Sequence, residues 1–480
     1  MKSIVSFSNF PVGKEPKKFM NKLCSLTKSI GIAGGVIVVV AALSPCFLPG
    51  SSDVKNLSTE QIDRLVQETF ETKCASCHKP GETVPGLMNT LSGGLIQRDI
   101  DNAVRMFNMD HPYSLATLSK IEHSVESGTM PPPAYTVVHW GTTMSLLEKN
   151  AMLQWVKQQR SQFDIAQLLG ERFSSTAIAP IPDSIPVDPK KAAVGELLFN
   201  DTRLSNDNTV SCATCHALNK GGTDNLPFSE GVRGQKGGIN APTVFNAAFH
   251  TIQFWDGRAK DLQEQAGGPP LNPVEMGYQH PDDWNKIIAK LNADTELTAK
   301  FLAAYPQGYS AETITNAIAE YERTLITPNS PFDKYLKGDE SAISNEAKEG
   351  YALFKKYGCQ MCHTGVALGG QSFEFADLKG DFFGGRELTN DDKGRMNFTK
   401  NEADMHKFRV PTLRNIALTW PYMHDASAEN LHEAVIKMFR YQIGDNSPIN
   451  GDVKKIVDFL RTLTGELNGK PLSGQEAPQG

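Results

Sequence analysis

The sequence predicts an all-α fold made of three small helical modules, each built around one short motif. The motif, Cys-x-x-Cys-His, occurs three times in the 480 residues. Amphipathic patterns with helical spacing recur at 282–303, 311–325, 428–439 and 451–464, whereas stretches that alternate as strands do are few. The chain is long enough for about three domains. Together these observations predict one domain for each motif.

The three motif copies contain six of the eight cysteines. They are Cys74, Cys77 and His78; Cys212, Cys215 and His216; and Cys359, Cys362 and His363. In such a motif the two thiols bond to the vinyl groups of a haem, and the adjacent His donates a ring nitrogen to the iron. One copy alone could be a zinc half-site or a disulfide. Three copies with almost no other cysteine predict three covalently bound haem c groups.

The amino-terminal segment differs from the rest in charge. The net charge is −6, but residues 1–52 carry +5, which leaves −11 for the remainder. Residues 29–52 are uncharged and follow a group of lysines, so we expect a membrane anchor of about 20 residues with its lysines in the cytoplasm. The haem domains would then lie in the periplasm, at the inner membrane. A cleaved signal peptide is the competing interpretation, but Pro45 is a poor residue after a cleavage site.

Changes in composition divide the chain into five regions. The acidic body argues against a nucleic-acid partner, because such a partner requires a basic face. Ser58, followed by Glu60 and Gln61, predicts a capped helix that leads into Cys74. The Ser- and Pro-rich composition of residues 174–189 is typical of a linker. The expected regions are 1–52 (cytoplasmic tip and anchor), 53–173 (first haem domain), 174–189 (linker), 190–335 (second haem domain) and 336–480 (third haem domain).

An internal repeat links the second and third domains. Gly195-Glu-Leu-Leu-Phe199 precedes Cys212, and Gly350-Tyr-Ala-Leu-Phe354 precedes Cys359. Both segments have the pattern of a short amphipathic helix that leads into a haem motif. The repeat therefore indicates two related c-type modules in succession.

The sixth ligand of each iron decides what its haem does. A Met or His in that position gives an electron carrier, and a vacant position gives a site for peroxide or oxygen. For the first haem we expect Met130, because the run Gly128-Thr-Met130-Pro-Pro-Pro133 offers a thioether on a stiff segment. Met130 could instead fill a hydrophobic gap. The alternative ligands are His111, His123 and His139.

From Ala193 onward the chain carries a series of specific motifs. They are Cys212–His216, Asn240-Ala-Pro-Thr243, Phe254-Trp-Asp-Gly-Arg258, Gln265, Asn272-Pro-Val-Glu-Met276, Pro411-Thr-Leu-Arg-Asn415, Pro421-Tyr-Met-His-Asp425 and Ala434-Val-Ile-Lys-Met438. In these motifs the chain resembles the bacterial dihaem cytochrome c peroxidases. With the additional amino-terminal haem motif and apolar stretch, it is most similar to the trihaem, membrane-anchored quinol peroxidases of that family.

The resemblance implies that His216 holds the haem at which peroxide reacts, with Glu275 as the acid–base residue and Gln265 as its polar neighbour. The surroundings of Glu275 in the sequence fit that role. Cleavage of peroxide needs a base that takes a proton from one oxygen and returns it to the other. A carboxyl in an apolar pocket does this when burial raises its pKa, and Glu275 stands among Pro, Val, Met and Gly.

The resemblance also implies that His363 and Met438 ligate the electron-transfer haem and that Trp255 lies between the two haems. Without that context, Trp255 would be interpreted as a core aromatic residue. Related dihaem enzymes that oxidise a protein substrate have Tyr where the electron-transfer haem has Met. Here the place is Met438, and Tyr441 follows three residues later. A Met favours a reducible haem and therefore a peroxidase.

A calcium ion between the modules is a further implication of the resemblance. Its ligands would be Asn240 and the backbone carbonyls of Thr419 and Pro421. One Asn and two carbonyls form no calcium motif that can be recognised in a sequence, so this expectation depends on the resemblance alone.

One position departs from the family. Many members carry a His in the loop after the second haem motif, and this His blocks the iron until the partner haem is reduced. The corresponding position here is Val232, which cannot ligate iron. We therefore expect a five-coordinate, high-spin haem at His216 without reductive activation. His250 and His280 are the remaining candidates for a blocking ligand.

The expected function is the reduction of hydrogen peroxide to water, in peroxide detoxification. Electrons would pass from a membrane quinol through the haems of His78 and His363 to the haem of His216. A soluble cytochrome c or cupredoxin donor is the alternative. A different class of function, a trihaem electron carrier without enzymatic activity, would require three six-coordinate irons. The oligomeric state stays open, and a homodimer is compatible with these expectations.

Overall fold

The computed structural model describes residues 54–132, apart from 84–85, 87–89 and 91–93, and residues 142–476. The chain forms two compact units. The first comprises residues up to 113 together with 124–157, and the second comprises residues 114–123 together with those from 158 onward. Within the described residues, no helix has the length and apolar character needed to cross a bilayer. The expected anchor, residues 1–52, lies outside this range.

The fold is helical, as predicted, and the described residues contain only short strands. The helices of the amino-terminal part are α2 (Thr59–Thr69), α3 (Ala75–His78), α5 (Leu95–Met106), α6 (Leu115–Ser127), α8 (Leu146–Arg160) and α9 (Ala166–Phe173). The capped helix predicted at Ser58 is α2: the Ser58 hydroxyl accepts from the backbone of Gln61, and the Gln61 side chain accepts from the backbone of Ser58. A π-helical turn, Phe70–Cys74, then delivers the first haem motif to α3.

The second and third haem domains expected from the sequence lie in one compact unit, and we keep these names for its two parts. The second consists of short helices, most of them around one apolar core. They are α10 (Pro189–Phe199), α11 (Cys212–Cys215), α12 (Leu262–Ala266), α13 (Trp284–Asn292), α14 (Thr295–Ala304), α15 (Ala311–Thr324) and α16 (Pro331–Leu336). Asp188 caps α10 by accepting from the backbone of Lys190 and Lys191, and Pro189 occupies the first turn, where its missing N–H costs nothing. Phe199, Phe245 and Phe301 are fully buried in the core of this domain.

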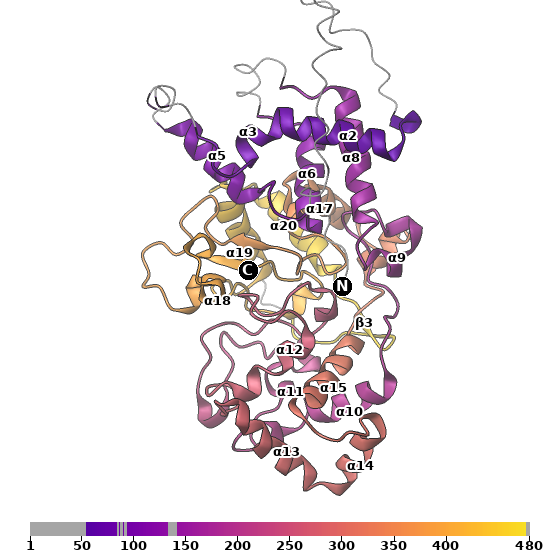
Figure 1. Ribbon diagram of the computed structural model, residues 1–480, viewed down its shortest axis with the longest axis vertical. Coiled ribbons are helices and arrows are strands. Elements are labelled where there is room, and N and C mark those ends of the chain that lie inside the picture. Colours follow the sequence, from indigo (N-terminus) through magenta and orange to yellow (C-terminus); the bar gives the residue numbers. More distant parts are fainter. Residues whose placement is uncertain (1–53, 84–85, 87–89, 91–93, 133–141, 477–480) are drawn as a thin grey trace, which may run out of the picture. The chain divides into compact units, whose positions relative to one another are not determined.

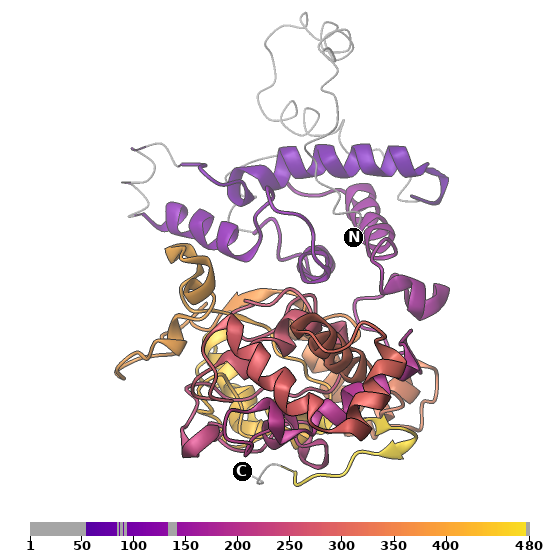
Figure 2. The same ribbon diagram turned by 60° about the horizontal axis from the view of Figure 1, so that its bottom comes forward.

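The third haem domain has α17 (Asn345–Lys356), α18 (Met396–Thr399), α19 (Leu431–Met438) and α20 (Asn450–Arg461). It also contains two antiparallel strand pairs. One pairs β1 (Phe373–Phe375) with β2 (Lys407–Arg409), and Phe373 lies opposite Arg409. The other is the hairpin of β3 (Glu466–Leu467) and β4 (Lys470–Pro471), drawn in yellow near the carboxyl terminus in Figure 2.

The internal repeat is visible as two pairs of crossing helices. In the first pair α10 packs against α15, and in the second α17 packs against α20 (Figure 1). Glycine permits both close approaches. A Cβ atom at Gly195 would collide with the carbonyl oxygen of Ala317, and a Cβ at Gly350 would collide with that of Lys455. The shared glycine of the two repeated segments is therefore the contact point between paired helices.

The segment expected to be a linker, residues 174–189, is extended, as its prolines favour. Its middle is nonetheless part of the packed interior, since Ile178, Ala179 and Ile181 are buried. Ile178 pairs with Gly365 in an isolated parallel bridge. This segment thus runs past the third haem motif before α10 begins.

Candidate active site

The three motif histidines share one hydrogen-bonding arrangement. Nδ1 of His78 lies 3.1 Å from the carbonyl oxygen of Ala103, Nδ1 of His216 lies 3.3 Å from that of Gly222, and Nδ1 of His363 lies 3.2 Å from that of Leu368. A carbonyl only accepts, so each Nδ1 carries the proton and each Nε2 keeps its lone pair. Burial lowers the pKa of all three rings, which keeps them neutral. A neutral ring oriented through Nδ1 is what an iron ligand requires.

A cavity of about 520 Å³ lies beside the second motif. We call it the peroxide cavity. Its walls include His216 and the three residues assigned to catalysis from the sequence: Trp255, Gln265 and Glu275. The structure therefore brings together side chains that are up to 59 positions apart in the chain. The paired thiols of Cys212 and Cys215 are in no disulfide, so both are available for a haem that fills this cavity.

Glu275 is held in the cavity wall with its carboxyl directed by Asn272. The Asn272 amide donates to Oε1 of Glu275 over 2.8 Å. Burial raises the pKa of the Glu275 carboxyl, while the nearby positive charge of Arg258 and the bond from Asn272 act in the opposite direction. A carboxyl whose pKa is raised by burial holds a proton more readily than an exposed one, as an acid–base group requires.

The loop at residues 231–232 supports Glu275 from behind. The Val232 N–H donates to the carbonyl of Glu275 over 3.0 Å, and a Cβ at Gly231 would collide with this backbone. The Val232 side chain is fully buried in the core of the second domain. Of the two other histidines considered as blocking ligands, His280 is exposed, whereas His250 lines the cavity. Val232 thus packs the core of the second domain and binds the backbone of Glu275, and the expected vacant iron position stays a prediction.

Trp255 joins the second and third domains. Its indole N–H donates to the carbonyl of Asn240 over 2.8 Å, and its ring meets the edge of Phe408 at 6.2 Å. The backbone N–H of Arg409 donates to the carbonyl of Trp255 over 2.8 Å. The indole is therefore fixed between residues of the second and third domains, and its expected place between the two haems stays a prediction.

Sequence reasoning missed Glu322, a buried carboxyl of α15 that also lines the peroxide cavity. Its Oε2 has no hydrogen-bond partner among the described residues, and burial raises its pKa to about 8. Nothing in the sequence signals this, because Glu322 stands in an ordinary helical pattern. Its carboxyl is neutral at pH 7 and adds a second proton-bearing group to the cavity.

A partly buried ion pair lies beside the third haem motif. Lys120 of α6 contacts Glu374 of β1 over 2.7 Å. Burial, and after it the charge of Glu374, raises the pKa of the Cys362 thiol. Met438, the expected sixth ligand, is the half-buried last residue of α19. Tyr441 packs against Phe382 with ring centroids 5.1 Å apart.

The residues considered as sixth ligands of the first haem have different surroundings. Met130 is 37% exposed and His111 is exposed. His123 packs against Gly358, beside the third haem motif. His139 lies outside the described residues. The assignment of Met130 stays a prediction.

The residues expected to bind calcium lie on adjacent segments. The Asn240 N–H donates to the carbonyl of His424 over 2.9 Å. The Asn225 amide donates to the carbonyls of Leu418 and Trp420, which flank Thr419 and precede Pro421. The Asn240 amide nitrogen donates to the carbonyls of Leu226 and Pro227, so its oxygen is the atom left to bind a cation.

Comparison with known proteins identifies two families. Residues 189–341 match the family described as di-haem cytochrome c peroxidase, and residues 37–158 match a haem-binding domain. Over 459 residues the chain is 43% identical to the cytochrome c peroxidase Ccp of Escherichia coli K12, covering 92% of this chain and 98% of that protein.

Other relatives match the carboxyl-terminal two domains. Cytochrome c551 peroxidase of Nitrosomonas europaea is 46% identical over 306 residues, covering 62% of this chain and 89% of that protein. The methylamine utilization protein MauG of Methylorubrum extorquens is 36% identical, covering 64% and 87%. Among solved structures, a MauG-like protein associated with microbial copper homeostasis aligns with a TM-score of 0.52 at 29% identity, covering 60% of this chain and 93% of that one.

Proposed function

The chain belongs to the di-haem cytochrome c peroxidase family, and on that premise we propose that it reduces hydrogen peroxide to water in the cavity beside His216. The observation that carries the assignment is the position of Glu275, a partly buried carboxyl in the wall of the cavity that His216 also lines. Haem c bound to Cys212 and Cys215 supplies an iron that receives peroxide and delivers electrons to it.

The chain's own residues handle the protons. The overall reaction consumes one hydrogen peroxide, two electrons and two protons, and yields two waters. Glu275 takes a proton from one peroxide oxygen and returns it to the other, while the Asn272 amide keeps the carboxyl in position. Gln265 lines the same cavity and offers an amide to the bound peroxide. Burial raises the pKa of Glu275, which favours the uptake of a proton that this exchange requires.

The peroxide cavity is proposed to be open before any electron arrives. Support comes from Val232, whose side chain is in the core and whose backbone is bound to Glu275. The fully oxidised protein should therefore show a high-spin ferric signal that disappears when peroxide is added. If the oxidised protein shows only six-coordinate, low-spin haems, the proposed five-coordinate haem is wrong. The protein would then fit a non-enzymatic electron carrier better.

Electrons are proposed to travel from the haem of His78 to that of His363 and then to that of His216. The haem-binding family match and the common Nδ1 arrangement of the three histidines support three haems. Trp255 supports the last transfer, because it contacts residues of both carboxyl-terminal domains. The electron-transfer haem would carry Met438 as its sixth ligand, and the first haem would carry Met130.

A calcium ion is proposed between the second and third domains. The free oxygen of Asn240 and the carbonyls of Thr419 and Pro421 would be its protein ligands, since hard cations prefer oxygen. Removal of calcium with a chelator should reduce turnover and be reversed by added calcium. Unchanged turnover after complete removal would contradict the proposal.

The proposed donor is a quinol, with the chain anchored in the inner membrane and its haem domains in the periplasm. The charge and apolar pattern of residues 1–52 support the anchor. A fused haem would replace a diffusing donor and keep its local concentration high. Full-length protein in detergent should consume peroxide with a reduced quinol analogue. Consumption only with a soluble cytochrome c or cupredoxin would reject the quinol and leave the peroxidase assignment intact.

A further inference from the structure

Three arginines are buried in the unit that holds the second and third haem motifs. Arg160, Arg409 and Arg414 are 1%, 2% and 0% exposed. Arg160 pairs with Glu122 over 2.7 Å, and Arg414 pairs with Asp333 over 2.8 Å. Such pairing is the rule for a buried guanidinium, because an isolated charge in a dry interior is strongly unfavourable.

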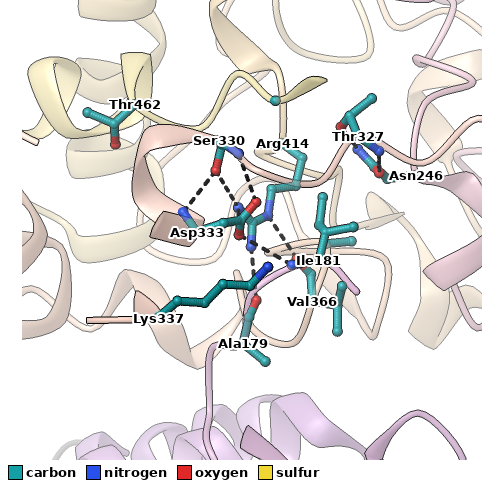
Figure 3. A network of polar contacts seen from close by, with 12 residues as sticks. Ala179, Ile181, Asn246, Thr327, Ser330, Asp333, Lys337, Val366, Arg414 and Thr462 are labelled. Atoms are coloured by element: carbon teal, nitrogen blue, oxygen red, sulfur yellow. Dashed lines mark hydrogen bonds and ion pairs between the residues drawn. The ribbon is translucent and has the colours of Figure 1, made fainter. Parts of the chain in front are cut away.

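Figure 3 shows how completely a structural arginine of this protein is surrounded. Arg414 donates to the carbonyls of Val366 and Ala179 over 2.9 Å each, and to the hydroxyl of Ser330 over 3.3 Å, in addition to its ion pair with Asp333. We call these residues the Arg414 network. Its positive charge is neutralised entirely by the chain.

Arg409 lacks such a partner. It donates from Nε to the carbonyl of Phe254 over 2.9 Å and contacts Nδ1 of His250 over 3.2 Å. Among the described residues, no carboxylate lies within ion-pair distance of its guanidinium. Burial alone lowers the pKa of Arg409, to about 10, so the group is still positively charged at pH 7. A buried cation without a counter-ion indicates that an anion from outside the polypeptide completes the site.

His250 provides a second, independent observation. Its Nδ1 accepts from Arg409, so its proton is on Nε2. Nε2 is buried and has no hydrogen-bond partner among the described residues. Gln253 is near enough to favour the protonated ring but does not bond to Nε2. The Arg409 guanidinium thus faces Nδ1 of His250, the Nε2–H donor is left free on the other side of the ring, and both residues line the peroxide cavity.

The anion that fits is a planar carboxylate within this cavity. A guanidinium binds a carboxylate through parallel N–H donors, and an adjacent imidazole N–H supplies another. A haem attached at Cys212 and Cys215 would supply such carboxylates, its propionates, to the cavity that both residues line. We propose that Arg409 and His250 bind a propionate carboxylate of the haem held by His216. This inference rests on the proposed haem site.

Arg409 also contacts the backbone of Trp255 and of the residue before it. The backbone N–H of Arg409 donates to the Trp255 carbonyl over 2.8 Å, and its Nε donates to the carbonyl of the preceding Phe254. The residue that neutralises the haem carboxylate is thus the residue that fixes the backbone of the indole between the domains. Arg409 is a positioning residue for electron transfer, and its charge raises the reduction potential of the nearby haem.

The test uses the fully haem-loaded protein and two readouts other than turnover. Resonance Raman spectra report the propionate bending band of the high-spin haem, and a spectroelectrochemical titration reports the midpoint potential of each haem. Arg409→Gln should shift the band and lower the potential of the high-spin haem, while that of the His363 haem stays unchanged. Arg409→Lys keeps the positive charge but lacks the parallel N–H donors of a guanidinium. It should therefore shift the propionate band and leave the midpoint potential of the high-spin haem nearly as in the wild type. His250→Gln should shift the band with little change in potential.

Arg414→Lys is the matched control, because it alters a buried arginine five residues away that already has a partner. It should lower thermal stability and leave both readouts as in the wild type. If Arg409→Gln does not assemble with haem, His250→Gln decides. An unshifted band in loaded His250→Gln overturns the proposal, and a potential shift confined to the His363 haem overturns the choice of haem. Absence of peroxide turnover in the wild type would contradict the proposed function without affecting these spectra.

Discussion

The peroxide cavity and the Arg414 network are both polar regions inside one unit, but charged side chains are neutralised by the chain only in the network. In the network, Arg414 and Asp333 neutralise each other and every bond ends on the chain. In the cavity, Arg409 has no counter-ion and Oε2 of Glu322 has no partner among the described residues. A paired interior group stabilises the fold, whereas an unpaired one identifies a place that a cofactor or substrate completes.

The largest effect is expected on peroxide turnover, from a substitution of Glu275 in the peroxide cavity. Glu275→Gln keeps the shape and the contact with Asn272 but cannot take up a proton. Loss of a positioned acid–base group typically lowers a rate by about 10²–10⁴-fold, so peroxide turnover should fall by that factor. The measurement is steady-state peroxide consumption. Glu296→Gln, on the exposed surface of α14, is the control and should be unchanged. A similar loss in both variants would show that the cavity carboxyl has no special role.

For the Arg414 network, we expect a substitution to reduce the stability of the protein and not its turnover. Asp333→Ala leaves the Arg414 guanidinium buried and unpaired, so the free energy of unfolding should fall by about 3–5 kcal/mol. Denaturant titration of the loaded protein measures it. Lys337→Met is the control, because Lys337 forms an exposed pair with Asp183, and such pairs contribute about 0–1 kcal/mol. Equal losses in the two variants would mean that burial does not distinguish the pairs.

A third prediction concerns the helix pair α17 and α20, whose close contact we expect to depend on a glycine. Gly350→Ala places a methyl group against the carbonyl of Lys455, and overpacking of this kind costs about 1–3 kcal/mol. Gly451→Ala, on α20, meets no atom within 4 Å and should instead stabilise the helix. Thermal unfolding of the two variants checks the sign. Destabilisation by Gly451→Ala would indicate that helix contact is not what Gly350 protects.

Local patterns were sufficient for the scaffold. The Ser58 cap, the two repeated glycine segments and the helical character of 311–325 could be predicted, because capping and periodicity are properties of neighbouring residues. The site residues Trp255, Gln265, Glu275 and His216 were predicted through a family resemblance, and the structure places all four on one cavity.

The unpaired groups could not be predicted from sequence. Arg409 follows Lys407 and Phe408 in a short strand, and Glu322 stands in a regular helix, so neither differs locally from a surface residue. What distinguishes them is burial without a partner, and that depends on contacts between segments distant in the chain. The difference between Arg409 and Arg414, five positions apart, is likewise invisible until Asp333 is placed in space.

A pH-dependent effect is expected from the unpaired carboxyl of Glu322. Its pKa in the folded protein is raised from 4.5 to about 8, so the folded state retains a proton that the unfolded state releases. The stability from this group is complete below the unfolded pKa and is lost as pH rises through the folded pKa, by about 1.4 kcal/mol per unit in between. Glu322→Gln removes the titration, so its stability relative to wild type should increase from pH 5 to pH 8. Denaturant midpoints measured at both pH values test this. A difference between variant and wild type that does not change with pH would mean that the carboxyl acquires a partner when haem fills the cavity, and the contrast with the Arg414 network would then be confined to Arg409.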